Sequence, residues 1–484
     1  MHRSSIFQAF RRLTQTALFA ERYGVSSRDA VEWNAERSRR SQSIHLQRRE
    51  MLRKSGAAIT VAALGGPLLR SQVAQAGLKK SNESVGIVGG GLAGLIAARE
   101  LTRAGAKVTV YEGSNRLGGR VQSLRGLFPN QVAEMGGELI DNLHKTMLGL
   151  AQEFDLEIED VNKVDGEVFY HFLGQDYSEA DVVDEFRQFV PTMKDDIRML
   201  SGEVSATAFT ANDRRLDLIS LLDYLDGNNA SRTAAGRLLR EVIRVAYTIE
   251  YGLEAFDQSS INFLHFIHAD NRSVFKPWGV FSDERYHIVG GNDQIVMRLA
   301  AELSPIIELG QKLIRVSRLS DGRLSLTFAG GRTTTRVHDR VILAIPFTTL
   351  RNVELQPSLA LPVWKRNVIA NFSLGDNTKQ MVGFIGRPWA DVGSNGASYA
   401  DLDRLQSTWE TNRSRSSEQH AILTNYSGGL QAELVDPTRP QQEAAAFLDS
   451  LEQVFPGAKA RALRDRNQVR SEEHTSELQS RGLI

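Results

Sequence analysis

A glycine-rich turn between two short apolar segments constrains the fold more than any other feature of this sequence. Residues 85–120 read VGIVGGGLAGLIAARELTRAGAKVTVYEGSNRLGGR. An apolar strand is expected at 85–88, and the helical spacing of apolar residues predicts a helix at 92–103. A second strand is expected at 108–111, and Glu112 ends it. A strand, a helix and a strand in this order form a βαβ unit, which implies a parallel sheet.

The turn carries the pattern Gly89-x-Gly91-x-x-Gly94, and Glu112 lies 23 positions after its first glycine. In such a pattern the first glycine permits the tight turn, the second lets a pyrophosphate approach the backbone, and the third allows close packing of helix on strand. The first helical turn, which includes Ala93, presents free N–H groups and a positive dipole end to phosphates. Glu112 is placed to accept hydrogen bonds from ribose hydroxyls. A glycine-rich loop alone is weak evidence, but the complete unit predicts dinucleotide binding.

Composition narrows the class of protein. A chain of 484 residues is long enough for two or three domains. It contains no cysteine, which excludes disulfides, thiolate catalysis and cysteine-based metal sites. No metal-binding motif such as HExxH, catalytic triad or acid pair is convincing, so we predict no metal site. Residues 1–76 hold 13 Lys or Arg against 5 Asp or Glu, whereas the remainder holds 45 against 53. The acidic body argues against a nucleic-acid partner.

The N-terminal region resembles an export signal. Residues 1–47 are polar and arginine-rich, and we expect an unstructured leader there, which a start codon assigned too far upstream would explain. Residues 48–76 then begin with Arg48 and Arg49, continue with an apolar run at 57–69, and end in A-Q-A. Paired arginines, a moderately apolar core and a small-residue cleavage site are typical of twin-arginine signals. The alternative is a buried helix preceded by a basic linker.

This resemblance implies passage through the twin-arginine export machinery and cleavage after Ala76. The expected product is periplasmic or secreted. The apolar run at 57–69 is shorter than the roughly 20 residues that a membrane span needs, so no stable span is expected.

A second glycine motif follows Glu112 directly. Arg116-x-Gly118-Gly119-Arg120 in this place resembles the flavin-containing amine oxidase family, which includes monoamine, polyamine and L-amino-acid oxidases. The resemblance implies FAD as the cofactor. In that family the glycines bring the backbone close to the ribityl-pyrophosphate, and the arginines complement its charge.

The segment VAEMGGELI at 132–140 resembles the second glycine pair of the family, which passes beside the isoalloxazine ring. The resemblance places Gly136, Gly137 and Glu138 at the cofactor. In relatives that oxidise amino acids, an arginine two places after this pair binds the substrate carboxylate, whereas Leu139 stands there in this chain. Glu138 would face a cationic di- or polyamine; alternatively it faces solvent or pairs with an arginine.

Later segments continue the resemblance. YHIVGGND at 286–293 resembles the return to the FAD domain, and VILAIP at 341–346 resembles a family strand that ends in proline. At the position of Leu313, relatives hold the adenine through backbone groups. Lys379, within TKQMVGF, matches the lysine that holds a water near flavin N5 and assists reoxidation by O₂. A solvated lysine is the alternative.

The predicted fold class is α/β: a Rossmann-like FAD-binding domain joined to an α+β substrate domain. The FAD domain is assembled from 83–150 and 285–350, and 451–469 is expected to start its C-terminal return. Helical patterns predict a helical substrate part at 151–284. Alternating apolar residues predict an antiparallel sheet at 351–450. The flavin ring is expected at the junction of the two domains, where ligand sites are common.

The activity that the resemblance implies is FAD-dependent oxidation of a primary amine or di- or polyamine to an imine. Hydrolysis of the imine yields an aldehyde and ammonia or a smaller amine, while O₂ is reduced to H₂O₂. The expected partners are therefore a small amine and O₂. Alternatives on the same scaffold are an L-amino-acid oxidase, a desaturase or a porphyrinogen oxidase.

The last residues, 470–484, do not resemble the family. Residues 470–480 match the in-frame translation of a sequencing adapter, although a charged helical tail is the alternative. Relatives continue with an aromatic residue of the substrate cage and an A-G-E segment that opens a helix toward the flavin, and neither is found here. We therefore expect a truncated record, and a further alternative is an inactive FAD-binding fragment.

Overall fold

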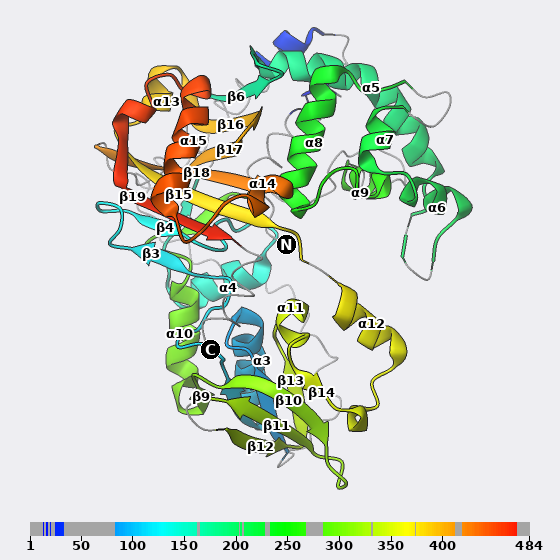
Figure 1. The fold of residues 1–484 in the computed structure, drawn as a ribbon, viewed down its shortest axis with the longest axis vertical. Helices are drawn as coiled ribbons and strands as arrows, with labels where there is room; N and C mark the ends of the chain where they lie inside the picture. Colours follow the sequence, from blue (N-terminus) through cyan, green and yellow to red (C-terminus); the bar gives the residue numbers. More distant parts are fainter. Residues whose placement is uncertain are drawn as a thin grey trace, which may run out of the picture.

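The computed structural model describes most of the chain from residue 83 to residue 471. The described residues are 83–161, 165–202, 204–205, 208–227, 233–267, 284–330, 333–372, 374–411 and 419–471, with 13, 16, 17, 20 and 25–32 near the N-terminus. The predicted export signal at 48–76 and residues 472–484 lie outside them. Two lobes are visible in Figure 1, with the glycine-rich turn in the lower one.

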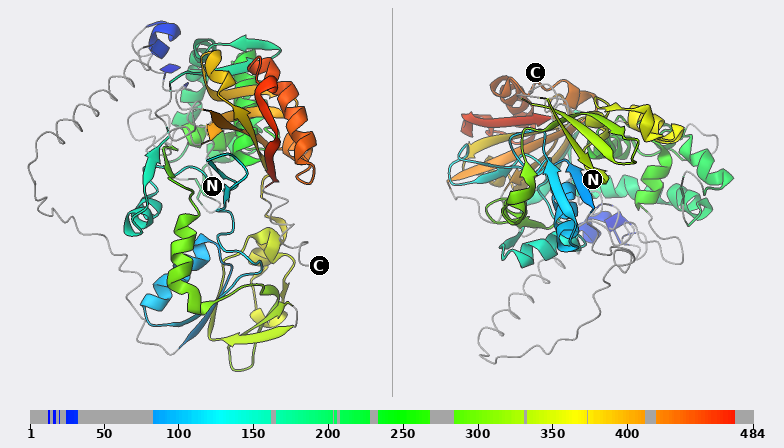
Figure 2. Two further views of the ribbon diagram at one scale, coloured as in Figure 1. Left: turned by 90° about the vertical axis from the view of Figure 1, so that its left-hand side faces the viewer. Right: turned by 90° about the horizontal axis from the view of Figure 1, so that it is seen from below.

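The lower lobe is built on a four-stranded parallel sheet in the order β13-β1-β2-β9. The glycine turn leads from β1 into α3, and α10 lies beside α3 on the same face of the sheet (Figure 2, left). Apolar side chains of β1, β2, α3 and α10 share one core, because each helix turns its apolar face onto the sheet. The bounds are β1 Ser84–Val88, α3 Leu92–Arg103, β2 Lys107–Tyr111, α10 Gln294–Leu303, β9 Ile307–Glu308 and β13 Arg340–Leu343.

A second four-stranded sheet, in the order β12-β11-β10-β14, covers the other side of this lobe. Its core includes Leu326 and Phe328, which pack with Val88 and Tyr111 of the parallel sheet. Two short helices, α11 and α12, follow β13. The bounds are β10 Lys312–Arg318, β11 Leu324–Ala329, β12 Thr334–His338, α11 Phe347–Leu350, β14 Glu354–Leu355 and α12 Val363–Asn371.

The upper lobe contains a seven-stranded sheet in the order β19-β15-β18-β17-β16-β6-β7. Helix α15 contacts β17 and β19, whereas α8 (Arg237–Tyr251) contacts β6, β16 and β18, so the two helices flank the sheet (Figure 1). The bounds are β6 Glu167–Phe172, β7 Gln175–Tyr177, β15 Asn377–Ile385, α13 Pro388–Asp391, β16 Ser394–Leu402, β17 Leu405–Thr411, β18 His420–Gly428, α14 Leu430–Glu433, α15 Pro440–Val454 and β19 Ala462–Ser471.

The end of the described chain differs from the prediction. Residues 451–469 were expected to start a return to the FAD domain, but α15 and β19 belong to the upper lobe. Strand β19 pairs antiparallel with β15, from Ala462 opposite Phe384 to Ser471 opposite Thr378. The strand reads ALRDRNQVRS and has no regular alternation of apolar and polar residues, so the period-two pattern did not indicate it.

The segment predicted as helical, 151–284, supplies helices α5 to α9 and also the strands β6 and β7 of the seven-stranded sheet. Further short elements of the described chain are β3, β4, α4, β5 and β8. The bounds are β3 Ser123–Arg125, β4 Val132–Glu134, α4 Lys145–Glu153, β5 Ile158–Asp160, α5 Glu179–Met199, α6 Ala211–Asp217, α7 Leu221–Leu225, α8 Arg237–Tyr251, α9 Ser260–Ile267 and β8 Tyr286–Ile288.

The prediction of an unstructured leader at 1–47 is wrong for its described residues. Leu13 and Ala17 are buried in the apolar core of the helical part, next to α5. Arg187 of α5 donates to the carbonyl oxygen of Val25 at 3.1 Å, and the hydroxyl of Ser27 donates to Asp184. The spacing of Leu13, Thr16, Ala17 and Ala20 is helical, and this pattern explains the buried stripe.

No described helix is both long enough and apolar enough to cross a membrane. Within the same residues, no group of three or more His, Asp or Glu side chains is arranged to hold a metal ion.

Candidate active site

In the glycine turn between β1 and α3, backbone atoms lie so close together that no side chain fits at Gly89 or Gly94. Gly89 has a φ of +111° and donates its N–H to the carbonyl oxygen of Tyr111 at 2.8 Å. A Cβ on Gly94 would lie 1.9 Å from the carbonyl oxygen of Gly89, and a Cβ on Gly89 would lie 2.5 Å from that of Ala344. Glycine is therefore required at both positions, as the motif predicts.

The opposite side of the same turn is open. Gly91 is the N-cap residue of α3. No side chain caps this helix N-terminus, and the first turn contains no acidic residue. A Cβ on Gly91 would meet only the Cα of Gly119, at 3.9 Å. Gly118 donates its N–H to the carbonyl oxygen of Gly90 at 2.9 Å, so the two glycine motifs lie side by side. Ala93 is exposed on this first turn.

Glu112 lies at the end of β2 and points toward the turn. Its Oε2 accepts from the N–H of Gly90 at 2.7 Å, and its Oε1 accepts from the N–H and hydroxyl of Ser114, each at 2.8 Å. Carboxylate oxygens can each accept further hydrogen bonds, so this arrangement leaves the predicted ribose contact possible.

Arg116 folds back over the second glycine motif. Its guanidinium donates to the carbonyl oxygens of Gly119 at 2.8 Å and of Leu117 at 3.3 Å. Burial lowers the pKa of Arg116, while the charge of Glu112 opposes the change. Within the described part of the chain, no carboxylate forms an ion pair with this guanidinium. The side chain of Arg120 is exposed.

Leu313 is buried at the start of β10. Two residues earlier, Gln311 donates its N–H to the carbonyl oxygen of Glu112 at 2.8 Å. The backbone before Leu313 therefore lies beside Glu112, the acid predicted to bind the ribose, and the adenine contact at Leu313 stays a prediction.

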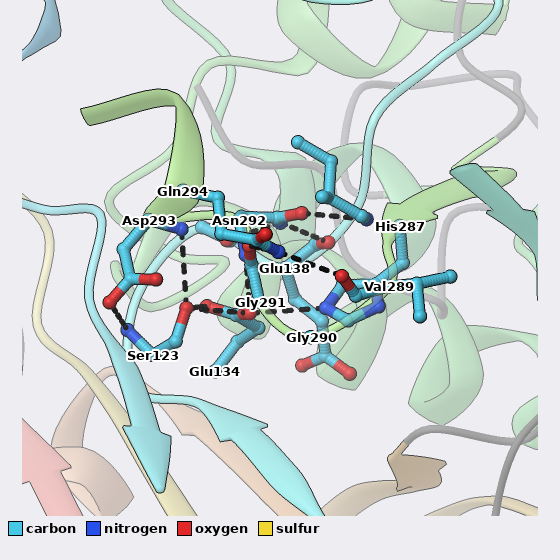
Figure 3. A network of polar contacts seen from close by, with 12 residues as sticks. Ser123, Glu134, Glu138, His287, Val289, Gly290, Gly291, Asn292, Asp293 and Gln294 are labelled. Atoms are coloured by element: carbon cyan, nitrogen blue, oxygen red, sulfur yellow. Dashed lines mark hydrogen bonds and ion pairs between the residues drawn. The ribbon is translucent and has the colours of Figure 1, made fainter. Parts of the chain in front are cut away.

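The second glycine pair packs on the end of the first motif. Gly137 donates its N–H to the carbonyl oxygen of Arg120 at 3.1 Å, and a Cβ on Gly136 would lie 1.8 Å from that oxygen. Asn292 supports the same loop, because its side-chain amide donates to the carbonyl oxygens of Gly137 at 2.9 Å and of Glu138 at 2.7 Å (Figure 3). All predicted glycines therefore lie in one contiguous region.

A buried network that the sequence did not reveal holds this loop (Figure 3). Glu134 accepts hydrogen bonds from the hydroxyl of Ser123 at 2.9 Å and from the N–H of Asn292 at 2.8 Å. His287 lies between two carboxylates, 3.1 Å from Glu134 and 2.7 Å from Glu159. Burial disfavours the charged ring, but the hydrogen bonds to both carboxylates outweigh it and raise the pKa of His287 to about 9.

Lys379 and Glu138 meet where the glycine loop of the lower lobe contacts the sheet of the upper lobe. The Lys379 ammonium forms an ion pair with Oε2 of Glu138, and the indole N–H of Trp409 donates to Oε1 at 3.1 Å. The ammonium also lies 5.6 Å from the centre of the Trp409 ring. Only 6% of Lys379 and 9% of Glu138 are exposed to solvent. Glu138 therefore pairs with a lysine and not with the arginine or solvent given as alternatives, and its contact with a substrate cation stays a prediction.

The residues fit a phosphate-bearing dinucleotide. The side of Gly91 that a Cβ would occupy is open, and the N-terminus of α3 has no side-chain cap. The half-buried guanidinium of Arg116 donates to carbonyl oxygens among the described residues and forms no ion pair with them. Each of these groups can receive an anion.

Comparison with known proteins decides the family. The profile of flavin containing amine oxidoreductases matches residues 92–478. The chain belongs to this family. As a flavin containing amine oxidoreductase it uses FAD, and the prediction of the family and of the cofactor is confirmed.

Among curated relatives, the chain is similar to a putative flavin-containing monoamine oxidase, AofH, of Mycobacterium tuberculosis. The two are 27% identical over 331 residues, which are 65% of this chain and 68% of the relative. A putative L-amino-acid oxidase of Bacillus subtilis, YobN, is 24% identical over 76% of this chain and 78% of its own length.

Two solved structures share the fold of this amine oxidoreductase. Cyclohexylamine oxidase from Brevibacterium oxydans matches with a TM-score of 0.66 at 19% identity, over 82% of this chain and 86% of that one. Wild-type putrescine oxidase bound to putrescine matches with a TM-score of 0.61 at 20% identity, over 78% and 83%. The predicted combination of an FAD-binding fold with a substrate domain is thereby confirmed.

Proposed function

We propose that this protein oxidises a primary monoamine to an imine, which hydrolyses to an aldehyde and ammonia, while O₂ is reduced to H₂O₂. The amine loses two electrons and two protons, and one O₂ takes up both. The observation that carries this proposal is the buried Lys379–Glu138 pair, which adjoins the glycine loop that resembles the flavin-ring loop of the family.

The chain's own part is to bind the cofactor, to orient the amine beside it and to exclude water. Bound FAD supplies the two-electron acceptor and passes the electrons to O₂. Gly91, Gly119 and Arg116 would hold the pyrophosphate, and Glu112 the ribose. Lys379 would hold a proton at Nζ beside the ring, shielded from bulk water by its burial.

The charge of the site favours a monoamine without a carboxylate. The Lys379 ammonium neutralises Glu138, so this carboxylate offers little to the second cation of a diamine. Leu139 stands where amino-acid-oxidising relatives have an arginine, so it offers nothing to a substrate carboxylate. The similarity to a putative monoamine oxidase supports the same choice.

An L-amino-acid oxidase is the second candidate, because one curated relative is named as such a putative enzyme. A peroxide-coupled screen of purified full-length protein separates the candidates. We expect turnover of alkyl or arylalkyl monoamines with higher kcat/KM than that of putrescine or of any neutral L-amino acid. Turnover of amino acids alone would replace the first candidate by the second.

We further propose export by the twin-arginine machinery, on the basis of residues 48–76. Replacement of Arg48 and Arg49 by lysine should keep the protein in the cytoplasm, whereas the unaltered chain should reach the periplasm or medium. N-terminal sequencing of the exported form tests cleavage after Ala76. An intact N-terminus would contradict it.

A further inference from the structure

The contact between Glu138 and Lys379 joins parts of the chain that are far apart in sequence. Glu138 follows β4 and the second glycine pair, Lys379 lies on β15, and Trp409 lies on β17. Both carboxylate oxygens are engaged, one by the ammonium and one by the indole N–H. The carboxylate is therefore held from two directions.

The buried ammonium of Lys379 depends on this contact for its stability. A buried ammonium is strongly disfavoured unless an opposite charge and hydrogen bonds compensate for lost water. The face of Trp409, 5.6 Å away, is a weak partner for a cation by comparison with a carboxylate. Without Glu138, the buried ammonium would lose its carboxylate partner and would turn toward water.

We propose that Glu138 is a positioning residue that holds the Lys379 ammonium beside the second glycine loop, with Trp409 setting the orientation of the carboxylate. The effect of this pair on turnover rests on the proposed function, whereas the pairing itself does not. Glu138 then acts through Lys379 and not by binding the substrate's cation.

The same sheet offers a matched control. Glu410 of β17 is also buried, accepts from Nε of Arg387 at 2.8 Å, and accepts from the indole N–H of Trp389 at 3.0 Å. This trio also joins a buried carboxylate to a basic side chain and an indole N–H, with an arginine in place of the lysine, and it lies entirely within the upper lobe. Loss of Glu410 therefore reports what breaking such a trio does to stability alone.

The experiment compares full-length FAD-loaded protein with Glu138→Gln, Glu138→Asp, Lys379→Met, the Glu138→Gln/Lys379→Met double variant, and Glu410→Gln. We expect the double variant to have a higher Tm than either single variant of the pair, because it leaves no unpaired buried charge. Additive losses of Tm in the double variant would overturn the pairing.

Turnover of the best monoamine separates positioning from structural support. Glu138→Gln and Lys379→Met should each lower kcat by about tenfold to a hundredfold, as misplacement of a reacting group does, with little change in KM. The double variant should fall no further, Glu138→Asp should recover part of the loss, and Glu410→Gln should lower Tm only. Equal losses of kcat in Glu138→Gln and Glu410→Gln would overturn a positioning role.

Rescue by a small cation gives a readout that needs no turnover. In Lys379→Ala, ethylammonium chloride should raise Tm more than potassium chloride at the same concentration, because the carboxylate and indole face suit an alkylammonium. In Glu138→Gln/Lys379→Ala this difference should vanish. If the two salts act alike on Lys379→Ala, the proposed pairing is wrong. If the unaltered protein oxidises no amine but rescue succeeds, the proposed function fails while the role of Glu138 as counter-ion stands.

Discussion

Nε2 of His287 lies 3.1 Å from Oε1 of Glu134, and both side chains are buried. This contact ties β8, which begins the return of the chain to the lower lobe, to β4, which leads into the second glycine pair. Glu134 also accepts a hydrogen bond from the backbone N–H of Asn292, and the side chain of Asn292 donates to the carbonyl oxygen of Glu138. The histidine therefore supports the loop that carries Glu138.

The raised pKa of His287 predicts a pH dependence of stability. The folded-state pKa is about 9, above the unfolded value of about 6.5. The stabilisation is therefore fully present below about pH 6.5 and is lost as pH rises through about 9. Thermal unfolding of the unaltered protein and of His287→Gln from pH 6 to pH 10 checks this, with a difference on the order of 3 kcal/mol at low pH that shrinks at high pH. A difference independent of pH would show that the ring is neutral in the folded protein.

Gly94→Ala should abolish FAD binding or folding of the lower lobe. Its Cβ would lie 1.9 Å from the carbonyl oxygen of Gly89, so α3 must move away from β1. Gly149 of α4 is the control, because a Cβ there meets nothing within 4 Å and alanine favours a helix by about 1 kcal/mol. Flavin absorbance per protein and Tm measure both effects. Normal FAD content in Gly94→Ala would contradict the role assigned to the turn.

Glu112→Ala should weaken FAD binding by about tenfold to a hundredfold, because it removes a charged acceptor from the turn and from the expected ribose contact. Glu100 is a suitable control, since it lies on the exposed face of α3 and 66% of its side chain is accessible. Titration of the apoproteins with FAD gives both dissociation constants. Equal values for the two variants would exclude a cofactor contact by Glu112.

The βαβ unit and the glycine motifs could be predicted because local backbone requirements fix their sequence. Gly89 has a positive φ, and Gly94 lies too close to the carbonyl oxygen of Gly89 to carry a side chain. Both requirements select glycine within one short stretch of sequence. Strands β15 and β18 pair antiparallel within 351–450, the segment whose alternating apolar residues predicted such a sheet.

Contacts between distant segments were not predictable in this way. Glu138 is 241 residues from Lys379, and nothing local to either residue indicates the other. His287 lies on β8, and its two carboxylate partners come from two other strands, β4 and β5. The place of β19 likewise depends on which strand edge is available. The adapter-derived end and the export signal stay predictions.

The packing of Leu13 and Ala17 predicts that the N-terminal segment stabilises the helical part. Ala17→Asp should lower Tm, because it places an unpaired charge in an apolar core. Arg28→Asp, at an exposed position near the same segment, should change Tm little. Protein that starts at residue 77 should unfold at a lower temperature than the full chain. Identical unfolding of both forms would show that this packing adds no stability.

The most direct test of the central claim is anaerobic mixing of the purified, FAD-loaded full-length protein with a primary monoamine. We predict that the visible flavin absorbance bleaches as aldehyde forms, and that admitting O₂ restores the colour with one H₂O₂ per aldehyde. A flavin that stays oxidised with every monoamine tested would contradict the account.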